Sequence, residues 1–180
     1  MILIHLSAEE CDRYEEVANR QCNAKIDGIR EKDSDYHRNQ NLSDKSDRAL
    51  PHRIGMLGSV AYGKHMGLFV DEEVFETHGD KEDFHNIEVK TSTWMGAGIE
   101  LKVKVSEYNR KFPRKYVLTR IDARDTSRVA LVGEISRDKF DKVKRLKNYG
   151  NQDCWVVGAK ELDPIRKASK KSRPVRRTAK

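Results

Sequence analysis

The sequence has few cysteines, and it lacks the long apolar runs that enter membranes. Cys11, Cys22 and Cys154 show no C-x-x-C or Cys/His spacing, so neither a disulfide framework nor a zinc site is indicated. No run approaches the roughly 20 apolar residues of a membrane span. The apolar start, residues 1–6, is too short for a signal peptide. We therefore expect a cytoplasmic protein without membrane association.

The chain is also short for two independent domains. Its 180 residues are 36% charged and 37% hydrophobic, which suits one globular domain with a modest core. We predict a single domain over residues 1–165.

Positive charge is concentrated at the end of the sequence. Residues 166–180 contain eight Lys or Arg and no acid, which leaves a net charge of −1 for residues 1–165 out of +7 in total. Such a run predicts a disordered cationic arm that contacts a polyanion, although a solubility tail is the alternative. The predicted nucleic-acid-binding residues in this arm are Lys170, Lys171, Arg173, Arg176 and Arg177.

Helical signals dominate the first third of the sequence. A strand is predicted over residues 1–6, followed by a capping box of Ser7 and Glu10 that starts a helix reaching about Ile29. Residues 32–53 are polar and aperiodic, which predicts a loop. A second helix is expected from about residue 55 to Gly67, and its glycines at positions 55 and 58 suggest close packing.

From residue 73 onward the hydrophobic pattern changes to period two, which is typical of strands. Strands are predicted at residues 74–75, 83–84, 87–90, 99–105, 116–121, 129–135 and 154–157, all in one sheet, with a short helix at 137–146. Helices followed by strands and then mixed elements indicate an α+β domain.

Residues 79–90 predict a β-hairpin that turns at His85 and Asn86, because Asn readily adopts a positive φ angle. In that register the side chains separate onto two faces. The apolar face would carry Phe84, Ile87 and Val89, and the polar face would carry Asp83, Glu88 and Lys90.

The polar face suggests a metal site. Asp83 and Glu88 would oppose each other with their β-carbons about 4.5–5.5 Å apart, where two carboxylates repel unless a cation lies between them. Mg²⁺ or Mn²⁺ would accept these oxygens and keep open positions for a phosphate oxygen and a water. Lys90, one pleat beyond Glu88, would position that water or offset charge on the phosphate. The sequence therefore predicts a catalytic set of Asp83, Glu88 and Lys90.

This arrangement resembles the PD-(D/E)XK nuclease superfamily, whose signature is an Asp at the end of one strand and Glu-x-Lys on the next. Asp83 matches the Asp and residues 88–90 match Glu-x-Lys. Residues 50–163 also look similar to nuclease-like proteins of bacteriophages, through Gly55-x-x-Gly58 and the later strands. The resemblance implies a restriction-endonuclease-like mixed β-sheet flanked by helices, the carbonyl of Val89 as a further metal ligand, and a host-cell cytoplasmic location if a phage encodes the chain.

One position departs from the family pattern. Such proteins often carry Glu on the helix where this chain has Ser59, which argues against a second metal ion unless Glu72, Glu73 or Asp80 substitutes. Asp80 also competes with Asp83 for the metal, but strand alternation places it on the opposite face.

A plain solvated strand is the main structural alternative. Lys81 would then pair with Glu88, and Asp83 with Lys90, in a charge-balanced surface. The chain contains a second Glu-x-Lys, at residues 100–102, which lacks an Asp at hairpin distance.

Further basic residues suggest phosphate contacts. Lys102 and Lys104 project to one face of their strand, and Tyr108 is positioned to stack on an unpaired base. The loop that follows adds Lys111, Arg114 and Lys115.

Two functional hypotheses follow. The first is a nuclease that uses Mg²⁺ or Mn²⁺ to hydrolyse DNA phosphodiester bonds, with DNA and a second copy of the chain, in a homodimer, as its expected partners. The second is a non-catalytic module that binds nucleic acid or protein and retains a nuclease-like fold.

Overall fold

The computed structural model describes residues 1–30, 45–70, 72, 82–93, 98–122, 124–150 and 152–167. The helices in these ranges are α1 (Ala8–Arg30), α3 (Lys45–Met66), α4 (Val105–Arg110), α5 (Arg137–Val143) and the short 3-10 helix η1 (Ala159–Glu161). The strands are β1 (Ile2–His5), β2 (Ile87–Ser92), β3 (Glu100–Lys104), β4 (Lys115–Asp122), β5 (Asp125–Ser136), β6 (Arg145–Asn148) and β7 (Asp153–Gly158). The predicted α+β class is confirmed.

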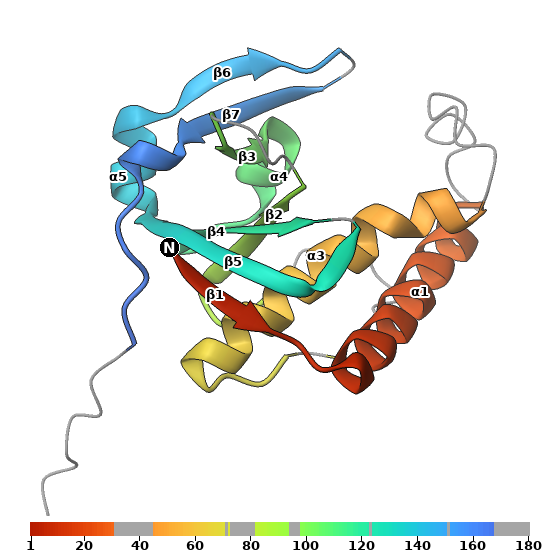
Figure 1. Cartoon of the computed structure of the whole chain (residues 1–180). Coiled ribbons are helices and arrows are strands. Elements are labelled where there is room, and N and C mark those ends of the chain that lie inside the picture. Colours follow the sequence, from red (N-terminus) through yellow and green to blue (C-terminus); the bar gives the residue numbers. More distant parts are fainter. Residues whose placement is uncertain are drawn as a thin grey trace, which may run out of the picture.

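The strands form two sheets. A four-stranded sheet has the order β1-β5-β4-β2, with β2 parallel to β4 and the other pairs antiparallel. A three-stranded antiparallel sheet has the order β3-β7-β6. In Figure 1, helices α1 and α3 lie on one side of the four-stranded sheet and the small sheet lies on the other. Because β2 stands at the end of the order β1-β5-β4-β2, it is an edge strand of the large sheet.

The prediction of a single sheet is wrong. β3 and β7 belong to the small sheet, because the chain turns into α4 directly after Lys104 and returns to the large sheet only at β4. Alternation in residues 99–105 specified a buried face, but it carried no information on the partner strand. The helix predicted for residues 137–146 ends at Val143, and Leu146 lies in β6.

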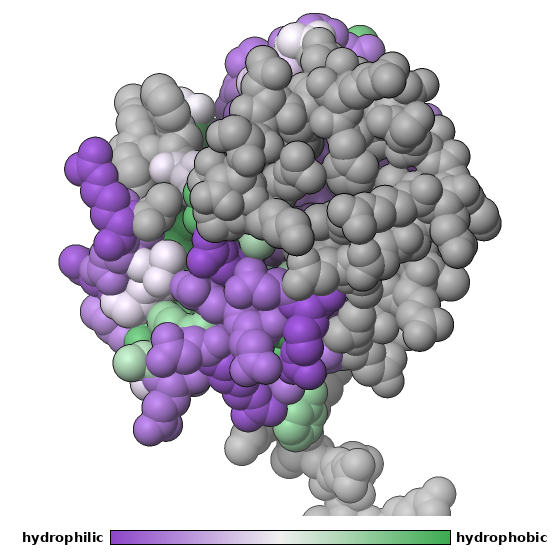
Figure 2. Space-filling view, turned by 90° about the vertical axis from the view of Figure 1, so that its right-hand side faces the viewer, coloured by the Kyte–Doolittle hydropathy of each residue, from purple (hydrophilic) through white to green (hydrophobic). Residues whose placement is uncertain are grey.

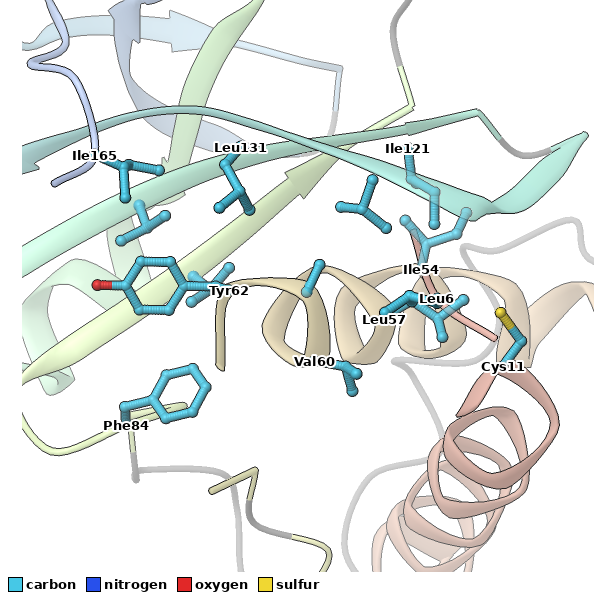
Figure 3. Close-up of a cluster of buried hydrophobic side chains, with 14 residues drawn as sticks. Leu6, Cys11, Ile54, Leu57, Val60, Tyr62, Phe84, Ile121, Leu131 and Ile165 are labelled. Atoms are coloured by element: carbon cyan, nitrogen blue, oxygen red, sulfur yellow. The ribbon is translucent and has the colours of Figure 1, made fainter. Parts of the chain in front are cut away.

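Two hydrophobic clusters lie on opposite faces of the large sheet, and β4 contributes to both. Val117 and Ile121 point to the cluster shared with α3, which Figure 3 shows around Leu57 and Tyr62. The opposite face of β4 packs against the small sheet and α5; this second cluster contains Leu101, Val103, Tyr116, Leu118, Ile135, Phe140 and Val157. This two-sided burial fixes the position of β4 and hence of its parallel neighbour β2.

The predicted capping box at the start of α1 is confirmed. The backbone N–H of Ser7 donates to Glu10 at 2.7 Å, and the backbone N–H of Glu10 donates to Ser7 Oγ at 3.1 Å. Lys64 of α3 also donates to Glu10 at 2.7 Å, which ties the two helices together.

Helix α3 begins earlier than the sequence predicted. Residues 45–53 of the expected loop are helical and the helix continues through Pro51, while residues 31–44 lie outside the described ranges. The proline removes one helical N–H, but the helix is held by packing further along. A Cβ on Gly58 would lie 2.5 Å from Thr119 Oγ1, which confirms close packing there, whereas Gly55 has nothing within 4 Å.

The face of the molecule drawn in Figure 2 is largely polar where its residues are described. Figure 2 shows a mainly hydrophilic face with small hydrophobic areas between the charged groups. Within the described residues, no helix is both long enough and apolar enough to span a membrane. The predicted basic arm lies outside the described residues from position 168 onward.

Candidate active site

The predicted turn at His85 and Asn86 is present. Phe84 and Ile87 exchange backbone hydrogen bonds of 3.1 and 2.9 Å, and Asn86 has a φ angle of 62°. Phe84 is buried, which anchors the turn in the core beneath the sheet. The two-residue turn therefore brings Asp83 back beside the edge of β2.

Asp83 caps the open edge of β2. Its Oδ2 accepts a hydrogen bond of 2.8 Å from the backbone N–H of Val89, and its Oδ1 accepts one of 3.3 Å from Ser59 Oγ. Burial raises the pKa of Asp83, while the charge of Lys90 and the Val89 N–H act in the opposite direction. The carboxylate is thus held by a backbone donor of β2, which pairs with β4 alone among the described strands.

Glu88 lies next to Asp83 and is almost fully buried, with 3% of its surface exposed. Lys90 Nζ lies 2.8 Å from Glu88 Oε1, and Lys111 Nζ lies 3.1 Å from both Glu88 oxygens. Burial raises the pKa of Glu88 to about 7. The positive charge of Lys90 acts to lower this pKa, and the negative charge of Asp83 raises it further.

A third carboxylate enters the site from α4. Lys90 Nζ lies 2.5 Å from Glu107 Oε1, so this ammonium group bridges Glu88 and Glu107. Burial alone would raise the pKa of Glu107, but Lys90 outweighs it and holds the pKa at about 2. Burial alone would likewise lower the pKa of Lys90, yet Glu88 and Glu107 together raise it.

Glu107 was not among the predicted site residues, and Lys111 was predicted only as one of several loop cations. Both belong to the site because α4, inserted between β3 and β4, carries Glu107 to Lys90, and Lys111 follows the helix as its C-cap residue and reaches Glu88. An available signal was their i, i+4 spacing, which puts an acid and a base on one helical face.

The solvated-surface alternative does not describe Glu88, since it is buried and paired with Lys90 and Lys111. Its suggested partner Lys81 lies outside the described residues, as do Glu73 and Asp80. Glu72 pairs with Arg13 at 2.7 Å, away from this site. Ser59, the position where the family often has Glu, does contact the site through Asp83.

The predicted residues line a common pocket of about 370 Å³. It is bounded by α3, residues 82–83, β2 and Gln21 of α1. Its lining includes Ser59, Asp83, Glu88, Val89, Lys90 and Thr91. The hairpin thus places Asp83, Glu88 and Lys90 where the sequence expected them to converge.

The charges of the site favour a cation. Three carboxylates (Asp83, Glu88 and Glu107) meet two ammonium groups (Lys90 and Lys111), which leaves a formal charge of −1. No group of three or more His, Cys, Asp or Glu side chains among the described residues is arranged to hold a metal ion. Two carboxylates and a backbone carbonyl remain a suitable donor set for Mg²⁺ or Mn²⁺, which bind few protein ligands and keep several waters. The residues present therefore fit such an ion.

The expected phosphate-contacting lysines lie on the small sheet. Lys102 and Lys104 are exposed on β3, and the strand register places Arg145 and Lys147 of β6 on the same face. Lys102 Nζ lies 4.2 Å from the centre of the Tyr149 ring, and Lys147 pairs with Glu100 at 2.8 Å. Lys104 forms no ion pair with a described residue.

Tyr108 does not present an open ring for base stacking. Arg137 lies 4.2 Å from its centre and Lys144 lies 3.9 Å from it. The predicted tail residues Lys170, Lys171, Arg173, Arg176 and Arg177 lie outside the described residues.

Comparison of the chain with family models, with curated proteins and with solved structures finds no match.

Proposed function

We propose that the chain is a metal-dependent nuclease of PD-(D/E)XK type that hydrolyses DNA phosphodiester bonds. The observation that carries this proposal is the convergence of Asp83, Glu88 and Lys90 on one pocket at the edge of β2. A restriction-endonuclease-like fold is proposed on the same grounds, since Glu-x-Lys lies on an edge strand of a mixed sheet covered by helices. DNA as partner, a homodimer and a cytoplasmic location are part of this proposal.

In this site Asp83, Glu88 and the carbonyl of Val89 would hold Mg²⁺ or Mn²⁺. When bound, such an ion polarises a phosphate oxygen and acidifies a bound water. The chain's own residues do the remaining work. Ser59 and the Val89 N–H keep the Asp83 oxygens in position, and Lys90 places a permanent positive charge beside Glu88 where the phosphate charge develops.

Substrate binding is proposed to use the exposed lysines of β3. Lys102 and Lys104 occupy the strand that leads directly into α4, which carries Glu107. A DNA strand whose phosphates contact Lys102 and Lys104 would therefore place a neighbouring phosphate at the pocket. The basic arm would add contacts that do not depend on base sequence.

The test is cleavage of supercoiled plasmid and of single- and double-stranded oligonucleotides with Mg²⁺, Mn²⁺ or EDTA. We expect cleavage only with metal, and a loss of about 10²-fold or more for Lys90→Met, as for other lost transition-state donors. Lys139→Met is the matched control. Lys139 on α5 pairs with Asp163 and does not touch the site, so this variant removes a lysine charge elsewhere.

Binding of DNA without any metal-dependent cleavage would favour the non-catalytic module. Equal cleavage by wild type and Lys90→Met would remove Lys90 from the catalytic set.

A further inference from the structure

Lys111 holds an unusual position on Glu88. Its Nζ lies 3.1 Å from Oε1 and 3.1 Å from Oε2, so the ammonium group faces both carboxylate oxygens equally. The Lys111 side chain is only 11% exposed. Glu88 already has Lys90 as an ion-pair partner at 2.8 Å. One ammonium group is enough to neutralise the Glu88 carboxylate. The second therefore adds positive charge that neutralisation of Glu88 does not require.

The backbone of Lys111 is fixed while its side chain has an alternative partner. The Lys111 N–H donates to the carbonyl of Glu107 at 2.9 Å, and Arg137 Nη1 donates to the carbonyl of Lys111 at 2.8 Å. Lys111 Nζ also lies 3.6 Å from Glu107 Oε1. A second carboxylate therefore lies near the ammonium group, and the contacts that hold the Lys111 backbone do not involve Nζ.

We propose that Lys111 is a positioning residue whose ammonium group occupies the cation position on Glu88 and is displaced when a divalent metal binds. This inference rests on the proposed metal site. A divalent ion and an ammonium group cannot both face the two Glu88 oxygens, because their charges repel strongly at that separation. Lys111 therefore keeps Glu88 ordered before the metal arrives and lowers the apparent metal affinity by competition. Once displaced, it supplies a second positive charge beside the pocket.

The first test measures Mn²⁺ binding by calorimetry without DNA. Lys111→Met removes the competing charge and keeps the side-chain length, so its Kd for Mn²⁺ should fall about tenfold or more below that of wild type. Lys142→Met is the control for net charge, because Lys142 is exposed on α5 and outside the site. An unchanged or higher Kd in Lys111→Met, relative to Lys142→Met, would overturn the proposal. Lys111→Gln replaces it if Lys111→Met fails to fold by circular dichroism.

The second test uses the wild-type chain. Amine-directed acetylation followed by mass spectrometry should modify Lys111 more readily with saturating Mn²⁺ than in EDTA, because the displaced ammonium group no longer donates to both oxygens of Glu88. Lys142 should react equally under both conditions. Equal protection of Lys111 with and without metal would contradict the inference.

These readouts separate the inference from the proposed function. Metal binding that tightens in Lys111→Met, with no DNA cleavage, would support Lys111 as competitor and contradict the nuclease. Cleavage with equal Mn²⁺ affinity in both proteins would support the nuclease and overturn the role of Lys111. Absence of Mn²⁺ binding in wild type and in the Lys111 variants would overturn both.

Discussion

Lys90 Nζ and Glu107 Oε1 lie 2.5 Å apart, although they are separated by 17 positions in the sequence. The ion pair joins the edge strand β2 to helix α4, and its members are 22% and 17% exposed. Because it also fixes Lys90 beside Glu88, this contact determines where the positive charge of the site lies.

If the chain cleaves DNA as proposed, Glu107→Gln should reduce cleavage without removing it. The amide accepts a weaker hydrogen bond, so Lys90 is less well fixed, and kcat should fall about tenfold while KM changes little. Steady-state cleavage kinetics check this. Glu100→Gln, which removes an acid paired with Lys147 on β3, is the matched control. A KM change with constant kcat would instead place Glu107 in substrate binding.

The same residue gives a stability change in acid. The pKa of Glu107 is lowered to about 2 in the folded chain from 4.5, so its contribution is present above about pH 4.5 and is lost as the pH falls towards 2. The free energy of unfolding should drop less steeply between pH 5 and pH 3 in Glu107→Gln than in wild type. Urea titrations at several pH values measure it, and parallel profiles would contradict the assignment.

Glu88 should act in the opposite direction. Its pKa is raised to about 7 from 4.5, so the folded chain binds an extra proton in this window and stability falls as the pH rises from about 4.5 to 7. In EDTA the melting temperature of wild type should decrease by a few degrees between pH 5 and pH 8. Glu88→Gln should show a flatter profile in thermal unfolding. A wild-type profile that rises across this range would be evidence against a raised pKa.

Two glycines of α3 give opposite expectations. A Cβ at Gly58 would lie 1.9 Å from Thr91 Oγ1 and 2.5 Å from Thr119 Oγ1, so Gly58→Ala should destabilise the chain by about 2 kcal/mol or more. Gly55 has open space, and Gly55→Ala should stabilise the helix by roughly 0.5–1 kcal/mol. Denaturant unfolding of both variants tests this packing, which supports β2 from beneath. Equal effects would show that α3 does not approach the sheet so closely.

The exposed lysines of β3 should make DNA binding depend on salt concentration. If Lys102 and Lys104 contact phosphates, replacing both with Gln should flatten the dependence of log K on log salt by about one unit per lost contact, for every DNA sequence. Fluorescence anisotropy at several salt concentrations measures the slope. Deletion of residues 166–180 provides the comparison for the basic arm. A slope that stays at the wild-type value in the double variant would exclude β3 from the binding surface.

Local sequence was sufficient where the interaction is local. Ser7 and Glu10 specified the start of α1, and Asn86 specified a two-residue turn that fixes which hairpin side chains share a face. Because strand alternation has a period of two, that turn was enough to predict that Asp83, Glu88 and Lys90 converge.

Local sequence patterns did not predict which distant segments pack or pair with each other. Residues 45–53 look like a polar loop, yet they are helical as the beginning of the long helix α3, whose later turns pack under the sheet. The assignment of β3 to a second sheet likewise depends on Val103 facing Trp155 of β7, a contact that no local pattern encodes.

The sequence by itself determined the turn that carries the candidate site, because its turn residues, its alternating faces and its Glu-x-Lys spacing all lie within twelve residues. Only the tertiary structure decided the electrostatic surroundings of that turn. Insertion of α4 between β3 and β4 brings Glu107 to Lys90 and Lys111 to Glu88, and their charges act through space between segments whose approach depends on how the two sheets pack.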